Sequence, residues 1–196
     1  MAYIIKPEHL IAVAGKVSPL MSGLVDWINK LCPSYEIDTP HEYAHFLAQA
    51  CHETDRFKTL REYASGNSYE GRIDIGNTRP GDGVKYKGRG IFQTTGRANY
   101  LQLGIKKGRR DLFINTPELL EQPEYAVWSA CEFWHTRNLN DPANHADNDI
   151  LKKKYKGKIL DVSPIEFISI TINGGYNGMD DRKKYYAIAL DVLTQN

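Results

Sequence analysis

Apolar residues recur at steps of three and four positions between Lys6 and Leu31. This spacing predicts two amphipathic helices, separated at Ser18-Pro19, because residues three and four apart share one face of an α-helix. Cys32-Pro33 is expected to end the second helix. The apolar positions are Leu10, Ile11, Val13, Leu20, Leu24, Val25, Ile28 and Leu31.

A third helix is predicted to begin at Thr39-Pro40. Threonine is a favoured N-cap residue, proline suits the first helical position, and Glu42 stands where a capping box requires it. We expect this helix to run through residue 57. One side of it would carry the stripe Phe46, Ala50, Glu53 and Phe57.

Glycines and the turn at Arg79–Gly83 exclude a long helix between Gly66 and Gly96. The segment 84–95 mixes β-branched and aromatic residues with glycine, which predicts a short β-hairpin. In such a hairpin Gln93 and Thr95 would point to one side of a strand.

Helical periodicity returns after this glycine-rich stretch. It predicts a helix over residues 123–137. A second helix is predicted to begin at Ser163-Pro164 and to end at Gly174, and a last helix to begin at Asp180-Asp181. The polar, lysine-rich segment 138–157 is predicted to be a mobile flap. The pattern predicts a mainly α protein with a small β-hairpin. The residues of the last helix that are expected to face the core are Tyr185, Ile188, Ala189 and Val192.

The chain has 196 residues, which favours one domain around one core. Its 25 basic and 24 acidic residues lack the basic excess of a typical nucleic-acid-binding protein, so we expect no nucleic-acid partner. Two basic clusters, at residues 106–110 and 152–158, either attract an anionic polymer or form solvated faces.

Three cysteines, Cys32, Cys51 and Cys131, form no C-x-x-C pair. They are predicted to be free thiols, which suits synthesis in a reducing cytoplasm. Residues 1–16 lack the pattern of a signal peptide, and no run of about 18 apolar residues occurs. The sequence therefore predicts no export signal and no stable membrane insertion.

Glu53 and Glu62 are the candidate catalytic pair. Two carboxyl groups that flank a glycosidic bond can hydrolyse it without a metal or cofactor. Glu53 is expected to face apolar surroundings, which favour a protonated acid. An unbroken helix would send the two side chains to opposite faces, so the helix has to end between them. Glu70 is the rival second carboxyl group, with a surface ion pair to Arg72 as its structural alternative.

Side chains suited to sugar binding follow the two glutamates along the chain. Amides and hydroxyls hydrogen-bond sugars, and aromatic rings stack on them, although each such residue alone is more often part of the core. Asn173 is either a sugar ligand or a helix C-cap. The candidates are Gln93, Thr95, Asn99, Asn173, Tyr63, Tyr69, Tyr86 and Tyr100.

The segment His41-Glu42-Tyr43-Ala44-His45 also matches the H-E-x-x-H signature of zinc proteases, with Glu62 available as a third ligand. Against a metal site, Glu42 already has a role in the predicted capping box. A zinc peptidase that uses His41 and His45 is kept as an alternative, and the preferred hypothesis contains neither a metal nor a cofactor.

Three stretches, HFLAQACHETDRFKTLREYASG, GDGVKYKGRGIFQTTGRANY and TINGGYNGMDDR, occur in this order. Together they resemble the family 19 glycoside hydrolases, and among these the compact bacteriophage endolysin branch, from about Thr39 to Leu193. The resemblance implies a lysozyme-like α+β fold, mainly helical, with a small β-hairpin beside the active-site cleft. It also implies hydrolysis with inversion at the anomeric carbon.

On this resemblance Glu53 corresponds to the general acid and Glu62 to the base. The cysteines of plant chitinases are not evident, and the region before the I-N-G-G motif is short, which favours peptidoglycan over chitin as the substrate. The other motif positions, which would bind sugar or hold the attacking water, fall on Gln93, Thr95, Asn99 and Asn173.

We therefore expect a single catalytic domain over residues 1–196, without a separate wall-binding domain. It would be a monomeric endolysin that hydrolyses the glycan strand of bacterial peptidoglycan and stays in the host cytoplasm until its release to the wall. A chitinase, a non-catalytic sugar-binding module and the zinc peptidase are the alternatives.

Overall fold

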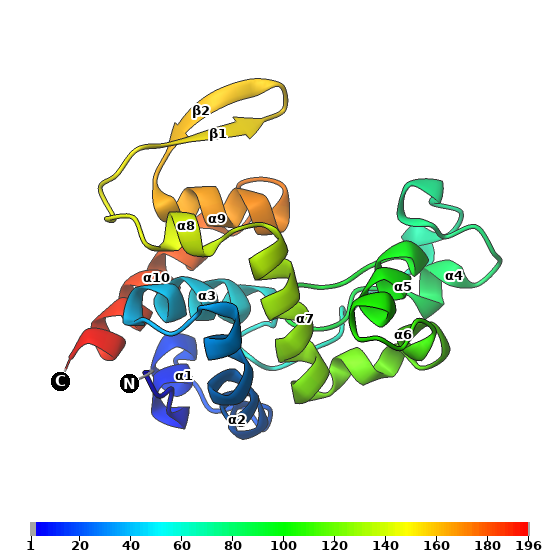
Figure 1. Cartoon of the computed structure of the whole chain (residues 1–196), viewed down its shortest axis with the longest axis horizontal. Helices are drawn as coiled ribbons and strands as arrows, with labels where there is room; N and C mark the ends of the chain where they lie inside the picture. The colour runs from blue at the N-terminus through cyan, green and yellow to red at the C-terminus, as the bar shows by residue number, and fades with distance from the viewer. Residues whose placement is uncertain (1–2, 196) are drawn as a thin grey trace. The chain divides into compact units, whose positions relative to one another are not determined.

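The structure is a computed structural model in which residues 3–195 are described. It is mostly helical and contains one two-stranded antiparallel sheet, as predicted (Figure 1). The chain forms two compact units: the first contains residues up to Lys58 and from Cys131 onward, and the second contains Thr59–Ala130. Within residues 3–195, no helix is long and apolar enough to cross a membrane.

The first unit is built from helices around α3. The predicted helix pair, capped third helix and C-terminal helices are all confirmed, and α7 begins in the second unit and ends in the first. The elements are α1 (Pro7–Ala14), α2 (Met21–Leu31), the 3₁₀ helix η1 (Cys32–Tyr35), α3 (Pro40–Glu53), α7 (Pro123–Thr136), α8 (Asn140–Ala143), β1 (Leu151–Tyr155), β2 (Lys158–Val162), α9 (Pro164–Asn173) and α10 (Met179–Thr194).

Helix α3 is buried on every side rather than along one stripe. All residues from Glu42 to Cys51 are buried, and α1, α8, α9 and α10 pack around the helix (Figure 1). Its N-terminus has the predicted capping box: the Glu42 amide donates to Thr39 Oγ1 at 3.3 Å, and the Thr39 amide donates to Glu42 Oε2 at 2.9 Å. The core of the first unit therefore forms around one fully enclosed helix.

Helix α3 ends at Glu53, four residues before the predicted end at Phe57. Asp55, Arg56 and Phe57 have φ angles of 48°, 61° and 58°. A left-handed residue other than glycine costs about 1–2 kcal/mol, so tertiary contacts have to hold this turn. The Phe57 amide donates to Thr54 Oγ1 at 2.9 Å, and Ser18 Oγ donates to the Phe57 carbonyl at 2.6 Å.

The second unit combines short helices with loops around an aromatic core. Its buried rings include Tyr86, Tyr100 and Phe113, with Ile91 and Leu120 beside them. The elements are the 3₁₀ helices η2 (Asn67–Tyr69) and η3 (Ile73–Ile75), α4 (Asp82–Lys85), α5 (Arg97–Lys106), α6 (Leu112–Asn115), η4 (Pro117–Glu121) and the first part of α7.

The β-hairpin predicted over residues 84–95 is wrong. This segment contains only isolated bridges, between Arg61 and Arg89 and between Arg89 and Thr94. The amides of Arg89 and Thr94 each donate to the other residue's carbonyl, at 3.1 and 2.8 Å, which closes a tight loop. Gln93 lies within this loop at φ 50°, so the strand ladder cannot continue and Gln93 and Thr95 do not share a strand face.

The hairpin begins instead within residues 138–157, the segment predicted to be a mobile flap, and its second strand follows directly after that segment. Strands β1 and β2 pair in antiparallel register from Leu151 opposite Val162 to Tyr155 opposite Lys158, and α8 occupies part of the same segment. The sequence pattern misled because three consecutive lysines, Lys152, Lys153 and Lys154, hid the strand periodicity. Burial alternates along β1, as a half-buried strand requires.

His45, on α3, is enclosed in the core of the first unit. Its ring stacks on Tyr186 at 4.1 Å between centroids, and neither ring nitrogen has a hydrogen-bond partner among the described residues. Burial, and to a lesser extent the nearby His41, lower the pKa of His45 to about 3. His45 is therefore neutral in the folded protein near neutral pH.

We expect His45 to make the folded state less stable in mild acid. As pH falls from 6.5 towards about 3, the unfolded chain binds a proton that the folded chain does not, so stability is full above this window and is lost within it. The loss is about 1.4 kcal/mol per pH unit. His45→Phe keeps a ring against Tyr186 and should remove this slope, measured by urea unfolding between about pH 6 and about pH 4. His41→Gln, an exposed control, should keep the slope; an unchanged slope in His45→Phe would contradict the interpretation.

Candidate active site

Glu53, the last residue of α3, contacts a buried arginine. Arg182 on α10 is 1% exposed and donates from Nη2 to Glu53 Oε1 and from Nη1 to Gln49 Oε1. Gln49 in turn donates from Nε2 to Ser169 Oγ at 2.9 Å. The prediction that Glu53 faces apolar surroundings is wrong, because Arg182 pairs with its carboxyl group.

Arg182 also ties the candidate acid to the segment that carries Asn173. Its Nε donates to the Asn177 carbonyl at 3.3 Å, and the same carbonyl accepts from Asn173 Nδ2 at 2.9 Å. Asn173 is the last residue of α9, whose C-cap is Gly174, so Asn173 is not the cap residue itself. Its amide oxygen remains for another donor, and its sugar-binding role stays a prediction.

His52 stands beside Glu53 and covers Gly178. A Cβ on Gly178 would lie 1.9 Å from His52 Cε1, so only glycine allows the imidazole to lie there. The pKa of His52 is lowered, first by burial and next by Arg182, while Glu53 and Asp181 act in the opposite direction.

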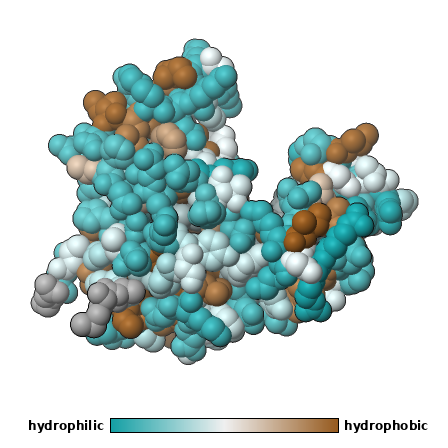
Figure 2. Space-filling model, in the orientation of Figure 1, coloured by the Kyte–Doolittle hydropathy of each residue, from teal (hydrophilic) through white to brown (hydrophobic). Residues whose placement is uncertain are grey.

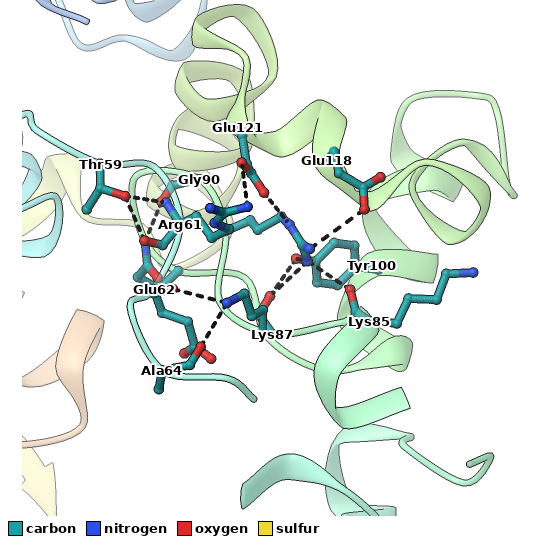
Figure 3. Close-up of polar contacts among 12 residues, drawn as sticks. Thr59, Arg61, Glu62, Ala64, Lys85, Lys87, Gly90, Tyr100, Glu118 and Glu121 are labelled. Atoms are coloured by element: carbon teal, nitrogen blue, oxygen red, sulfur yellow. Dashed lines mark hydrogen bonds and ion pairs between the residues drawn. The ribbon is translucent and has the colours of Figure 1, made fainter. Parts of the chain in front are cut away.

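Glu62 belongs to the second unit and lies on a segment that pairs with the glycine-rich loop. The Glu62 amide donates to the Gly88 carbonyl at 3.0 Å, and the Gly90 amide donates to the Leu60 carbonyl at 2.8 Å. Lys87 Nζ donates to the carbonyls of Glu62 and Ala64, at 3.3 and 2.8 Å (Figure 3). These contacts hold the backbone of Glu62 from both sides.

Arg89 organises the glycine-rich loop that pairs with this segment. Its Nε donates to Glu121 Oε1 at 2.7 Å, and its Nη1 donates to the Lys85 carbonyl at 2.8 Å and to the Tyr100 hydroxyl at 3.1 Å. Tyr100 donates in turn to the Lys87 carbonyl at 2.7 Å. A buried guanidinium thus bonds backbone carbonyls just before Gly88, those of Lys85 and Lys87.

Only one oxygen of the Glu62 carboxyl group has a partner among the described residues. Tyr69 donates its hydroxyl proton to Oε2 at 3.0 Å, whereas Oε1 is buried and has no hydrogen-bond partner there. Burial raises the pKa of Tyr69, and the bond to Glu62 raises it further, so Tyr69 stays a donor. Since buried oxygens are normally hydrogen-bonded, Oε1 is available to a water or a ligand.

The side chain of Gln93 lies next to that of Glu62, above Gly88. A Cβ on Gly88 would lie 2.7 Å from Gln93 Oε1 and 2.9 Å from Glu62 Oε2. Gln93 donates from Nε2 to the Gly90 carbonyl at 2.8 Å, and its buried Oε1 has no partner among the described residues. The missing side chain of Gly88 therefore lets two acceptor oxygens converge.

Thr95 and Asn99 extend this group along the chain. Thr95 Oγ1 donates to the Gln93 carbonyl at 2.8 Å, and Asn99 Nδ2 donates to the Thr95 carbonyl at 2.7 Å. Both side chains support the turn that carries Gln93, and their contact with a sugar stays a prediction.

The aromatic candidates differ in accessibility. Tyr63 is 71% exposed, so a sugar could stack on it. Tyr100 is fully buried, and Arg89 and Lys87 engage its hydroxyl, so the prediction that it contacts substrate is wrong. Tyr86 is also fully buried and packs against Tyr100.

Glu70, the rival second carboxyl group, has a local structural role. It accepts hydrogen bonds from the amides of Gly81 and Gly83, both at 2.7 Å, where α4 begins. Arg72 pairs with Asp74 rather than with Glu70. This observation favours Glu62 over Glu70 as the second catalytic group, which stays a prediction.

The H-E-x-x-H segment is used for folding. The Glu42 carboxylate accepts from the Thr39 amide and, at 2.9 Å, from Asn144 Nδ2, while His45 stacks on Tyr186. Within residues 3–195, no group of three or more histidine, cysteine, aspartate or glutamate side chains is placed to hold a metal ion.

No family model matches the sequence. Individual proteins do: a "glycosyl hydrolase family 19 domain-containing protein" of Haemophilus influenzae is 28% identical over 131 residues, covering 67% of this chain and 54% of that protein. An endochitinase of Pisum sativum is 32% identical over 171 residues, covering 74% of this chain and 51% of that protein. The chain spans about half the length of these curated relatives.

Solved structures agree with this similarity. Chitinase C from Streptomyces griseus matches 99% of this chain and 78% of its own, with a TM-score of 0.65 and 18% identity. The chain has the fold of the family 19 chitinases. A class IV family 19 chitinase from Zea mays matches 98% of this chain and 94% of its own, with a TM-score of 0.67 and 19% identity. Sequence relatives and fold together support the family 19 resemblance.

Sequence reasoning missed Arg182, which is buried in the first unit. On α10 the residues predicted to face the core lie one position before the buried ones, except Ala189, which is buried as predicted. A charged residue in register with buried apolar positions would have been the signal. The buried residues of α10 are Met179, Arg182, Tyr186, Ala189 and Leu193.

We predict that Arg182→Met destabilises the fold far more than loss of a surface ion pair. It would leave the Glu53 and Gln49 oxygens facing an apolar group, which costs near the lower end of the ~3–5 kcal/mol typical of a broken buried pair, because Glu53 is 18% exposed. Lys183, next to Arg182 on α10, forms a partly exposed ion pair with Glu166 on α9. Lys183→Met should cost less than about 1 kcal/mol. Denaturant unfolding measures both, and equal losses would refute the role given to Arg182.

Proposed function

We propose that this chain hydrolyses the glycan strand of bacterial peptidoglycan in the manner of an endolysin, with Glu53 as general acid and Glu62 as general base. Its family 19 fold and its relatives support a glycosidase. The observation that carries the proposal is the Glu62 carboxyl group, with one oxygen bonded to Tyr69 and the other buried without a partner among the described residues.

The geometry around Glu62 suits a base that activates water. Tyr69 donates to Oε2 and so orients the carboxylate, which leaves Oε1 to accept a proton from water. Gln93 Oε1, above the same glycine, can accept a hydrogen bond from an amide or hydroxyl of a sugar. In an inverting hydrolase this water attacks the face of the sugar opposite the leaving group.

Glu53 would donate a proton to the leaving oxygen of the glycosidic bond. Proton donation leaves a carboxylate, and the Arg182 guanidinium in contact with it stabilises that negative charge. Arg182 also holds Gln49, so the acid has a fixed position at the end of α3. No step in this scheme uses a metal or a cofactor.

Chitin is the second candidate substrate, because the similar proteins named above include an endochitinase and two chitinases. The short region before the I-N-G-G motif favours peptidoglycan. On this proposal the protein would act on the wall from inside an infected bacterium, after release from the cytoplasm, as a monomer.

Glu53→Gln should reduce release of reducing ends from purified peptidoglycan by about 10²–10⁴-fold, because glutamine keeps the size of the side chain and cannot donate the proton. The thermal unfolding midpoint should stay close to that of the wild type. A chelator should not change wild-type activity. Activity of Glu53→Gln within a few fold of wild type would overturn the assignment, and chelator-sensitive release of new amines would favour the zinc peptidase.

Glu62→Gln and Glu70→Gln form a matched pair for the second group. Glu62→Gln should abolish most of the hydrolysis, since its amide cannot accept a proton from water. Glu70→Gln should retain hydrolysis and lose stability, since it weakens the bonds to Gly81 and Gly83. Proton NMR of the first product formed should show the inverted anomer. The reverse order of activities would make Glu70 the base.

A further inference from the structure

The β1–β2 hairpin is firmly attached to the first unit through one of its faces. Leu151, Tyr155 and Leu160 pack against a cluster formed by Val162, Ile170 and Met179, together with Phe167. Lys153 points the same way: its Nζ lies 4.1 Å from the centroid of the Phe167 ring and donates to Thr171 Oγ1. Burial lowers the pKa of Lys153, and Arg137 lowers it further. The orientation of the hairpin on α9 is therefore determined by packing.

The turn of this hairpin is as well defined as its packed face. Register pairs Tyr155 with Lys158, which leaves Lys156 and Gly157 as a two-residue loop. Their φ angles are 47° and 79°, and a positive φ at both positions is typical of a type I′ turn. A short turn of this kind holds the neighbouring lysines in fixed positions.

Positive charge without an ion-pair partner among the described residues lies at the turn and on both faces beside it: Lys154 is on the solvated face, and Lys158, opposite Tyr155, is on the packed face. Lys152 pairs with Asp161 across the strands. Lys154, Lys156 and Lys158 are exposed and form no ion pair with any described residue. We call these three residues the turn lysines. Figure 2 shows a largely hydrophilic surface over β1 and β2 with isolated apolar spots, and Ile159, opposite Lys154, is 65% exposed.

The turn end of the hairpin contacts the segment that follows Asn173. A Cβ on Gly175 would lie 3.1 Å from the Tyr155 hydroxyl oxygen, and the Tyr155 and Tyr176 rings meet edge to face at 6.0 Å between centroids. Lys156 Nζ lies 5.2 Å from the centroid of the Tyr155 ring. The charge of Lys156 is therefore near the segment that follows the candidate sugar ligand, within the same unit. Solvated lysines elsewhere on the surface would not lie near a candidate sugar ligand.

We infer that the turn lysines bind carboxylates on the peptide side chains of the glycan substrate, so that the protein selects an acidic, peptide-bearing glycan over a neutral one. This inference rests on the proposed function and assigns it a substrate class. The whole chain has 25 basic and 24 acidic residues, so its net charge supplies no general attraction for anions. The turn lysines supply this attraction locally, by pairing with carboxylates. Chitin is neutral and has no carboxylate for them to bind.

The test compares Lys154→Gln/Lys156→Asn/Lys158→Gln with the control Arg109→Gln/Arg110→Gln, which removes exposed charge from the second unit. Asparagine at 156 tolerates the positive φ of the turn. Each protein also carries Glu53→Gln, and its binding to insoluble peptidoglycan is measured by co-sedimentation at about 0.05 M and about 0.3 M salt. The same measurement uses peptidoglycan whose carboxylates have been converted to neutral amides.

The lysine variant should bind native peptidoglycan roughly tenfold more weakly at low salt, and the control should bind like the parent. The parent should lose the same factor on amidated peptidoglycan or at high salt, while the lysine variant should be insensitive to both changes. Equal binding of native and amidated peptidoglycan by the parent, or unchanged binding by the lysine variant, would overturn the inference. So would a lysine-dependent affinity for anionic lipid vesicles without one for peptidoglycan.

Hydrolysis by the same proteins with Glu53 restored separates the two proposals. Reducing ends from wild type, with a raised KM and unchanged kcat in the lysine variant, support both. Reducing ends with equal KM in all proteins support the proposed function and refute the inference. Lysine-dependent binding without reducing ends from any protein refutes the proposed function and retains the binding surface.

Discussion

Burial of α3 on every side is the constraint on which the first unit depends. Because residues 42–51 are all enclosed, a charged or amide side chain on this helix needs a partner from a neighbouring element, whereas the neutral His45 ring stacks on Tyr186 instead. Gln49 finds Ser169 and Arg182, and Glu53, at the end of the helix, shares the same arginine. The contacts that pack the core therefore also position the candidate acid. Any change that shifts α10 against α3 would move the charge partner of Glu53.

In the second unit, hydrogen bonds to backbone carbonyls, rather than an enclosed helix, position the candidate residues Glu62 and Gln93. Arg89 binds carbonyls that precede Gly88, and Lys87 binds the carbonyl of Glu62 itself. The absence of a side chain on Gly88 leaves room for Glu62 and Gln93. The cost of this arrangement is two buried acceptor oxygens without partners among the described residues. Groups of this kind are rare in folded proteins and often mark a site of function, because a ligand or a water completes them.

The buried arginines and the turn lysines of this protein differ in their carboxylate partners. The buried cations, Arg89 and Arg182, each have carboxylate partners, and they position other groups. The turn lysines have none among the described residues, and they project from a hairpin that packs on α9. Placing unpaired cations on a rigid turn reduces the entropy lost when an anion binds, which is why we assign them to recognition rather than to stability.

The sequence by itself determined the elements whose signals are local. Thr39 with Glu42, and Ser163 with Glu166, complete capping boxes within one helical turn, and Gly174 adopts the left-handed C-cap conformation that ends α9. The three family stretches also selected Glu53, Glu62 and Gln93 as candidates, and their roles stay predictions. Only the tertiary structure decided the rest. The left-handed turn after Glu53 depends on Ser18, which is 39 residues away, and the Arg182 partnership joins positions 129 apart. The hairpin over β1 and β2 escaped prediction because its lysines alternate between a packed and a solvated face, and only the neighbouring α9 distinguishes these faces. Local chemistry decides where an element begins and ends, whereas long-range packing decides which face is buried and what pairs with it.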